Sequence, residues 1–138
     1  MKQQPFHLAL PCKDIEETKK FYLNTLGAKL GRNSDQWIDI DLYNNQITFT
    51  ASGKFDFDFK NYRLGKHVLP SFHYGIILDE KSWNDIYSIL NQTKLNIVKE
   101  FTVFKDKTGE HRSFFVKDPN GYLVEFKNFK SKDEIFSK

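Results

Sequence analysis

Two histidines, His7 and His73, occupy matching places in two similar stretches of the sequence. Each is the second residue of an apolar, strand-like run, at residues 6–10 and 72–78, and an acidic start to a helical pattern follows each run. This repetition indicates one structural unit used twice, with an imidazole at the same position in each copy. Two imidazoles on equivalent strands are suited to sharing one metal ion.

Strand alternation predicts which residues accompany each histidine. His7 shares a strand face with Ala9, and His73 shares a face with Gly75. Small neighbours of this kind leave room for an ion and a ligand.

Glu125 is the candidate for a third ligand, because it lies among apolar residues in the strand pattern at residues 122–127. Burying an unpaired carboxylate is costly, and a metal ion relieves that cost. The alternative is that Glu125 pairs with a lysine such as Lys127. Two neutral imidazoles and one carboxylate favour Fe(II) for oxygen chemistry, while Mn, Ni or Zn would serve as Lewis acids.

The composition is that of a soluble globular protein with a single domain, residues 1–138, with 39% hydrophobic and 28% charged residues. The net charge of +3 comes from lysines scattered among acids, so we expect no nucleic-acid partner. The one cysteine excludes an internal disulfide. We find no long apolar run and no apolar N-terminal segment, so we expect a cytoplasmic protein that does not enter a membrane.

The order of predicted elements is β-α-β-β-β, twice. Module 1 covers residues 5–51 and module 2 covers residues 71–130, with Asp14 and Asp79 as helix N-caps. Each module alone would leave one sheet face bare, so pairing them would bury that face. The first strand is expected to end before Pro11, and residues 71–78 are expected to form one strand.

Residues 52–70 form the predicted connector between the modules. Residues 52–69 show no clean periodicity, so we expect a long connection there. Such a segment either covers a site or merely joins the two modules.

The chain resembles the vicinal oxygen chelate superfamily, which includes glyoxalase I, extradiol dioxygenases, fosfomycin-resistance proteins and bleomycin-binding proteins. The resemblance rests on both histidine runs, on the helix with Phe21-Tyr22 and Leu26-Gly27, and on the ending Asp118-Pro119-Asn120-Gly121 through Glu125-Phe126. It implies an α+β fold of two paired βαβββ modules, whose curved mixed sheets surround a metal-binding cavity. It also implies a homodimer and a small-molecule substrate.

The superfamily can take metal ligands from the first and last strands of each module. By resemblance, His7, His73 and Glu125 fill three of these positions, and Gln46 is the residue nearest to a fourth. This set resembles the iron site of extradiol dioxygenases more than the four-ligand site of glyoxalase I.

The dioxygenase signature is matched only in part. Gly109-Glu110-His111 fits its beginning, but the spacer after His111 is short and Phe115 stands where the signature has tyrosine. His111 is therefore either a catalytic acid or base beside the metal, or simply a loop histidine.

Two function classes remain open from the sequence. The first is a metal-dependent dioxygenase or lyase, with a cavity wall drawn from Trp37, Gln46, Arg112 and Phe115. The alternative is a drug-binding or resistance protein that performs no chemistry.

Overall fold

The computed structural model describes residues 3–93 and 97–138. The chain forms two compact units. Unit 1 comprises Met1–Phe57 and Asp118–Gly121, and unit 2 comprises Asp58–Lys117 and Tyr122–Lys138.

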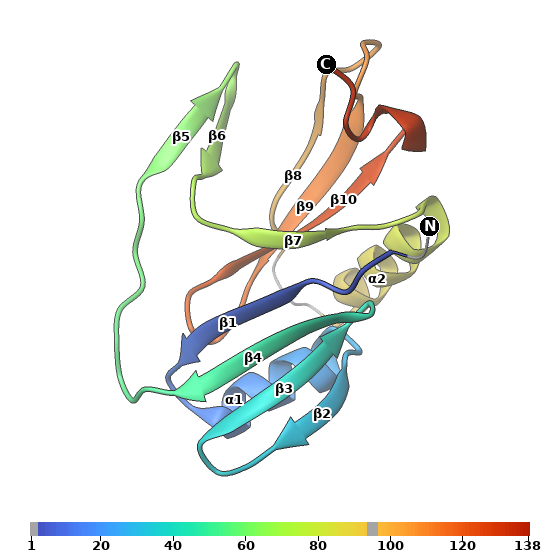
Figure 1. The fold of residues 1–138 in the computed structure, drawn as a ribbon. Coiled ribbons are helices and arrows are strands. Elements are labelled where there is room, and N and C mark those ends of the chain that lie inside the picture. Colours follow the sequence, from blue (N-terminus) through green and yellow to red (C-terminus); the bar gives the residue numbers. More distant parts are fainter. Residues whose placement is uncertain (1–2, 94–96) are drawn as a thin grey trace. The chain divides into compact units, whose positions relative to one another are not determined.

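Unit 1 is a four-stranded sheet with one helical segment against one face (Figure 1). The strand order is β1-β4-β3-β2, with β1 parallel to β4 and the other neighbours antiparallel. The elements in chain order are β1 (His7–Cys12), α1 (Ile15–Lys20), the π-helical segment η1 (Phe21–Thr25), β2 (Lys29–Asn33), β3 (Trp37–Leu42) and β4 (Asn45–Ala51).

The helical segment of unit 1 begins and ends where the sequence predicts. Asp14 Oδ1 accepts a hydrogen bond of 2.8 Å from the backbone N–H of Glu17, as an N-cap residue does. Gly27 follows the segment with φ +70°, a conformation that glycine adopts at little cost.

The core of unit 1 follows from the alternation of β3. Ile38 and Ile40 are fully buried, and Ile38 pairs with Phe49 of β4 on the same face. The Phe49 ring packs against Tyr22 of η1, with ring centroids 4.8 Å apart. Asp39 and Asp41, which alternate with the apolar residues of β3, point to the other face of the sheet.

β1 runs further than the sequence predicts, through Pro11 to Cys12. Proline was expected to end the strand because it has no N–H to donate. β1 lies at the sheet edge, where one side of a strand needs no partner, and Pro11 keeps its register opposite Thr50.

The turn Asp118–Gly121 belongs to unit 1, although the strands on either side of it belong to unit 2. Asn120 is fully buried, and its Oδ1 accepts a hydrogen bond of 2.8 Å from the backbone N–H of Lys13. Its Nδ2 donates to Thr18 Oγ1 at 3.2 Å. The turn that the sequence predicts therefore also satisfies polar groups at the start of the helical segment.

Unit 2 repeats the sheet order of unit 1, as β7-β10-β9-β8 with β7 parallel to β10. It adds a two-stranded hairpin and a short 3₁₀ turn. The elements in chain order are β5 (Asn61–Leu64), β6 (His67–Pro70), β7 (Tyr74–Ile77), α2 (Glu80–Gln92), β8 (Ile97–Val103), β9 (His111–Lys117), β10 (Leu123–Phe129) and η2 (Lys132–Glu134).

The helix α2 packs on unit 2 through one apolar face. Asp79 caps it by accepting a hydrogen bond from the backbone N–H of Ser82 at 2.8 Å. Trp83 is buried, and its Nε1 donates to the carbonyl oxygen of Phe126 in β10 at 2.9 Å. The face of β10 that carries Phe126 is therefore covered, and the opposite face carries Glu125.

Residues 52–69 are not a connection throughout, because the hairpin β5–β6 occupies most of residues 61–70. Gly65, with φ +59°, lies in its turn. Leu69 is buried in an apolar cluster with Phe101 of β8 and Phe115 of β9. The two strands are only four residues long and lack regular alternation, so their pairing depends on this distant contact.

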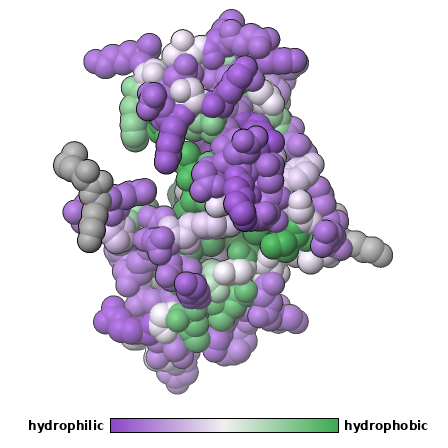
Figure 2. Space-filling view, turned by 90° about the vertical axis from the view of Figure 1, so that its right-hand side faces the viewer, coloured by the Kyte–Doolittle hydropathy of each residue, from purple (hydrophilic) through white to green (hydrophobic). Residues whose placement is uncertain are grey.

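The α+β fold with two copies of one sheet topology is confirmed. Among the described residues, no helix is both long and apolar enough to cross a membrane. The face drawn in Figure 2 is largely hydrophilic, with smaller hydrophobic areas between, in keeping with the charged composition.

The close pairing of β7 with β10 depends on Gly75, which stands opposite Glu125. A Cβ atom at Gly75 would collide with the carbonyl oxygen of Glu125 and would lie 2.9 Å from the Cβ of Glu125. The sequence interpretation took Gly75 as space for an ion. The structure gives a different reason, because only glycine lets the two backbones come so close.

Gly75→Ala is therefore expected to lower the free energy of unfolding by about 1–3 kcal/mol or more, since β7 must move away from β10. Urea unfolding measures the change. Ala9→Ser is the matched control, because Ala9 holds the corresponding position in unit 1, where a Cβ is already accommodated. Equal stability of Gly75→Ala and the wild type would contradict this account of the pairing.

Candidate functional site

His73 and Glu125, two of the three predicted ligands, lie together in unit 2. The His73 Nε2 and Glu125 Oε2 atoms are 3.0 Å apart, and the Glu125 side chain is 7% exposed. Glu125 is central in β10. His73 immediately precedes β7, whereas the sequence predicted that it lies within the strand.

The backbone around His73 also fixes its ring. The His73 Nδ1 atom lies 2.7 Å from the carbonyl oxygen of Pro70. A carbonyl oxygen only accepts, so Nδ1 carries a hydrogen and Nε2 faces Glu125. Residues 71–72 form a bend that brings the ring back to Pro70, which explains why the strand begins only at Tyr74.

The pair shifts the pKa values of both groups. The hydrogen bond to Glu125 raises the pKa of the His73 imidazole above its ordinary value, against the opposing effect of burial. Burial pushes the pKa of Glu125 upward, but the hydrogen bond from His73, the charge of Lys127 and the hydroxyl of Ser113 outweigh it and lower the pKa overall. Glu125 is therefore a carboxylate at neutral pH.

A carboxylate oxygen and an unprotonated ring nitrogen 3.0 Å apart would repel each other, so the contact needs a positive charge between the atoms. A proton on Nε2 supplies it, and so does a metal ion bound by both. Two ligand atoms at right angles, each about 2.1 Å from one ion, lie about 3.0 Å apart. His73 and Glu125 therefore fit a divalent cation.

The surroundings of the pair include an aromatic ring, a hydroxyl and the charge of Lys127. Phe115 stands opposite Glu125 in the sheet, and its buried ring meets the His73 ring edge to face at a centroid distance of 5.1 Å. The buried Ser113 hydroxyl lies near enough to Glu125 to lower the pKa of the carboxyl, although no hydrogen bond of full geometry joins Ser113 Oγ to a described residue. Ser113 lies on the same face of β9 as Phe115, so its hydroxyl is oriented toward the side of the sheet that carries Glu125.

His7, the third predicted ligand, belongs to unit 1, where it is the exposed first residue of β1. Neither unit by itself, over the described residues, gathers three His, Cys, Asp or Glu side chains able to hold an ion. The three-residue ligand set therefore stays a prediction.

The strand registers show which residue of unit 1 corresponds to Glu125. Two positions after His73, Gly75 pairs with Glu125, and two positions after His7, Ala9 pairs with Thr48. The counterpart of Glu125 is therefore Thr48 and not Gln46, whose part in the site the sequence left open. Gln46 instead stands opposite His7 itself.

Asp39 is a buried carboxylate that the sequence interpretation missed. It is 4% exposed and stands opposite Thr48. Its Oδ1 accepts from Thr48 Oγ1 at 2.6 Å, and its Oδ2 accepts from Gln46 Nε2 at 3.3 Å and from Arg32 Nε at 3.2 Å. The alternation of β3 shows that Asp39 faces away from the apolar core, but only the neighbouring strands show that it is buried.

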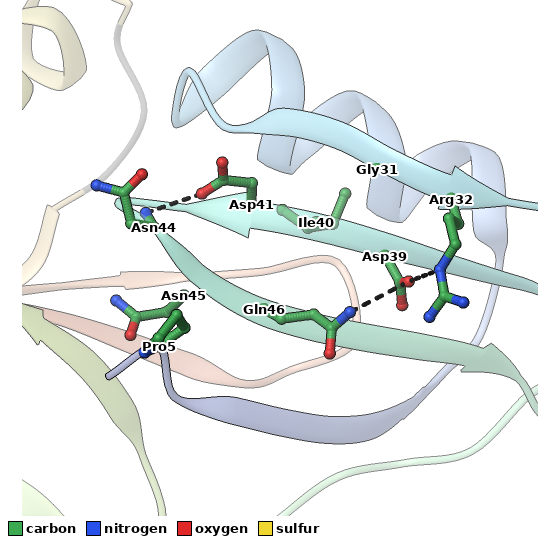
Figure 3. A pocket seen from close by; sticks show the side chains of 9 residues that line it. All are labelled: Pro5, Gly31, Arg32, Asp39, Ile40, Asp41, Asn44, Asn45 and Gln46. Atoms are coloured by element: carbon green, nitrogen blue, oxygen red, sulfur yellow. Dashed lines mark hydrogen bonds and ion pairs between the residues drawn. The ribbon is translucent and has the colours of Figure 1, made fainter. Parts of the chain in front are cut away.

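A pocket of about 440 Å³ opens beside this cluster, entirely within unit 1 (Figure 3). It runs across β2, β3 and the β3–β4 turn to Pro5. Its polar lining side chains include Arg32, Asp39, Asp41, Asn44, Asn45 and Gln46.

His111, the predicted catalytic histidine, is the first residue of β9 and not a loop residue. Its Nδ1 lies 2.8 Å from the carbonyl oxygen of Gly109, and its ring packs on Phe129 with centroids 4.7 Å apart. Burial lowers the pKa of His111, although the contact with Gly109 opposes the shift. His111 is therefore neutral at pH 7, with Nε2 free of the Gly109 contact.

The remaining predicted cavity residues lie on different faces. Trp37 begins β3 on the Asp39 face, and the Arg32 guanidinium lies 5.8 Å from its ring centroid. Arg112 lies on the other face of its sheet from Glu125, with its guanidinium 4.0 Å from the ring centroid of Trp83 in α2. The structure therefore brings Gln46 to the pocket and directs Arg112 to the helix.

The family model described as the Glyoxalase/Bleomycin resistance protein/Dioxygenase superfamily matches residues 4–126. The chain belongs to this superfamily. This agrees with the duplicated sheet topology and with the two histidine runs from which the sequence resemblance was drawn.

Solved structures of this superfamily share the fold over nearly the whole chain. A glyoxalase/bleomycin resistance protein/dioxygenase from Alicyclobacillus acidocaldarius is 27% identical, with 96% of each chain covered and a TM-score of 0.80. The fosfomycin resistance protein FosX from Listeria monocytogenes is 15% identical, with 97% of this chain and 98% of that chain covered and a TM-score of 0.66. A lactoylglutathione lyase from Agrobacterium tumefaciens is 12% identical, with 92% and 94% covered and a TM-score of 0.66. No curated protein matches the chain in sequence.

The raised pKa of His73 predicts how stability depends on pH in the metal-free protein. The contribution of His73 is fully present below its unfolded pKa of about 6.5 and is lost as the pH rises through the higher folded value. The lowered pKa of Glu125 adds stability that is lost only as the pH falls through that lower value. The contribution of this pair to the free energy of unfolding should therefore decline as the pH rises above about 6.5, whereas the lowered pKa of His111 opposes a decline only below that value.

Glu125→Gln should flatten this decline, because it removes the charge that holds the proton on His73. Urea unfolding at a series of pH values measures the slope. Glu100→Gln is the matched control, since Glu100 is exposed and accepts a hydrogen bond from Tyr87. Identical slopes in Glu125→Gln and the wild type would show that the pair does not form in solution.

Proposed function

We propose that this protein is a divalent-metal-dependent enzyme acting on a small substrate that chelates the ion through neighbouring oxygens. The observation that carries the proposal is the contact between His73 Nε2 and Glu125 Oε2, which needs a proton or a metal ion between the two atoms and has the spacing of two ligands of one ion. His7 completes the proposed ligand set, because it holds the corresponding first-strand position of the other unit.

Besides the two ligands, three residues of unit 2 have a definite part in this proposal. A bound divalent ion would polarise the substrate oxygens and stabilise negative charge on them. Pro70 orients His73 through Nδ1, and the Phe115 ring packs against the imidazole, so the ring is held ready as a ligand. His111, neutral at pH 7, accepts a proton at Nε2.

The reaction we favour is an Fe(II)-dependent dioxygenation. Two histidines and one carboxylate with open positions are the ligand set of non-haem Fe(II) oxygenases. Phe115 provides no hydroxyl to the substrate, so a ring-cleaving reaction that needs a tyrosine is not proposed. The similar structures include a lactoylglutathione lyase, which supports metal-dependent lyase chemistry with Mn, Ni or Zn as the other enzymatic reading. A homodimer acting in the cytoplasm remains part of the proposal.

The second candidate is a protein that sequesters a small molecule without chemistry. The pocket of unit 1 favours it, because its polar lining needs no metal to bind a ligand. Metal binding separates the two candidates.

The metal test is a titration of chelator-treated protein with Fe(II), Mn(II) and Zn(II), performed without oxygen and followed by calorimetry. The wild type should bind about one ion per chain. His73→Ala and Glu125→Gln should each weaken binding by about a hundredfold or more, since losing a supporting residue alone typically costs about 10- to 100-fold. His7→Ala should have the same effect.

His67→Ala is the matched control, because His67 lies in β6 and its ring packs on Phe101 rather than near Glu125. It should leave metal affinity unchanged. A wild type that binds no ion would refute the enzyme and leave the sequestering protein. Binding that depends on His73 and Glu125 but not on His7 would remove His7 from the ligand set.

A further inference from the structure

The pocket of unit 1 carries opposite charges at its two ends. Arg32, next to Asp39, lies at one end, and Asp41 with Asn44 lies at the other (Figure 3). Gln46 lies between them. Such a charge arrangement selects a ligand by two separate groups, and not by net charge alone.

The Arg32 end presents a guanidinium on a side chain that is 80% exposed and is anchored at Nε. Arg32 Nε donates to Asp39 Oδ2 at 3.2 Å, and the guanidinium lies over the Trp37 ring. Over residues 3–93 and 97–138, Arg32 donates its one hydrogen bond through Nε, so both Nη nitrogens keep their hydrogens for a ligand. These two nitrogens form a planar fork that matches the two oxygens of a carboxylate or phosphoryl group.

Asp39 does not offer its own charge to a ligand. Its two oxygens already accept three hydrogen bonds, from Thr48, Gln46 and Arg32, and it is 4% exposed. Asp39 is thus a positioning residue that aims the guanidinium. Gly31 permits this arrangement, because a Cβ there would lie 3.2 Å from the Cβ of Asp39.

The Asp41 end keeps a carboxylate oxygen for a donor. Asp41 Oδ1 accepts a hydrogen bond of 2.8 Å from the backbone N–H of Asn44, which holds the side chain in the turn. Asp41 lies two residues after Asp39 on the same face of β3, a separation of about 7 Å along the strand. A ligand that reaches from one end to the other is therefore a small molecule.

We propose that this pocket binds a small organic molecule with an oxyanion at one end and an ammonium or hydroxyl group at the other. The Nη fork of Arg32 binds the oxyanion, and Asp41 accepts from the ammonium or hydroxyl. This names a substrate class for the enzyme proposed above, and in that respect it rests on the proposed function. The binding itself requires no metal.

Amide chemical shifts of isotope-labelled, chelator-treated protein measure binding of five probes. Those with both groups are 4-aminobutyrate, 4-hydroxybutyrate and 3-aminopropylphosphonate, which separate ammonium from hydroxyl and carboxylate from phosphoryl. Butyrate and butylamine carry one group each. At least one two-group probe should bind about tenfold or more tightly than both one-group probes, with shifts centred on β2, β3 and the β3–β4 turn.

Substitutions assign the two ends separately. Arg32→Met should weaken binding of the two-group probe about tenfold or more. Arg32→Lys should recover only part of that affinity, because lysine keeps the charge but not the fork. Asp41→Asn keeps an acceptor for the backbone N–H of Asn44. It should reduce the affinity for the two-group probe to the affinity for butyrate. Arg63→Met and Asp35→Asn are the matched controls, both exposed and outside the pocket, and should change nothing.

The inference is overturned if no probe binds saturably, if one-group probes bind as well as two-group probes, or if Arg32→Met binds like the wild type. The metal titration is independent, because it depends on His73 in unit 2. Probe binding without metal binding would refute the proposed enzyme alone, and metal binding without probe binding would refute this inference alone.

Discussion

A buried carboxylate must have a positive partner, and the contact between Glu125 and His73 meets that requirement in unit 2. Much of the surrounding structure serves this contact. Gly75 lets β7 lie against β10, and the carbonyl of Pro70 holds the imidazole with Nε2 toward the carboxylate. A proton and a divalent ion satisfy the same need, so the contact that a proton on His73 makes favourable would also suit a divalent ion.

The duplication reproduces a topology but not a surface. In corresponding registers, unit 2 has Glu125 opposite Phe115, whereas unit 1 has Thr48 opposite Asp39. In unit 2 the buried carboxylate lies on β10, whereas in unit 1 it lies on β3, the strand that corresponds to β9. Its positive partner is an imidazole in unit 2 and the guanidinium of Arg32 in unit 1. A histidine beside a carboxylate favours a cation, whereas a guanidinium favours an oxyanion, so the two sheets favour different ligands.

Local features were predictable because their causes lie within a few residues. The N-caps at Asp14 and Asp79, the glycine that ends the helical segment, and the alternation of β3 all depend on neighbours in sequence. The hairpin β5–β6 was not predicted, because its short strands are stabilised by apolar contacts with β8 and β9. The continuation of β1 through Pro11 depended likewise on β1 lying at a sheet edge.

The sequence by itself determined the repeated βαβββ pattern and marked His7, His73 and Glu125 as unusual residues in apolar runs. Only the tertiary structure decided which polar residues meet, because strand register is a property of the folded sheet. It paired Glu125 with His73 in place of the lysine that the sequence allowed, and it buried Asp39 under donors from two other strands. Side-chain type sets what a residue can bind, whereas burial and register set whether it is placed to do so.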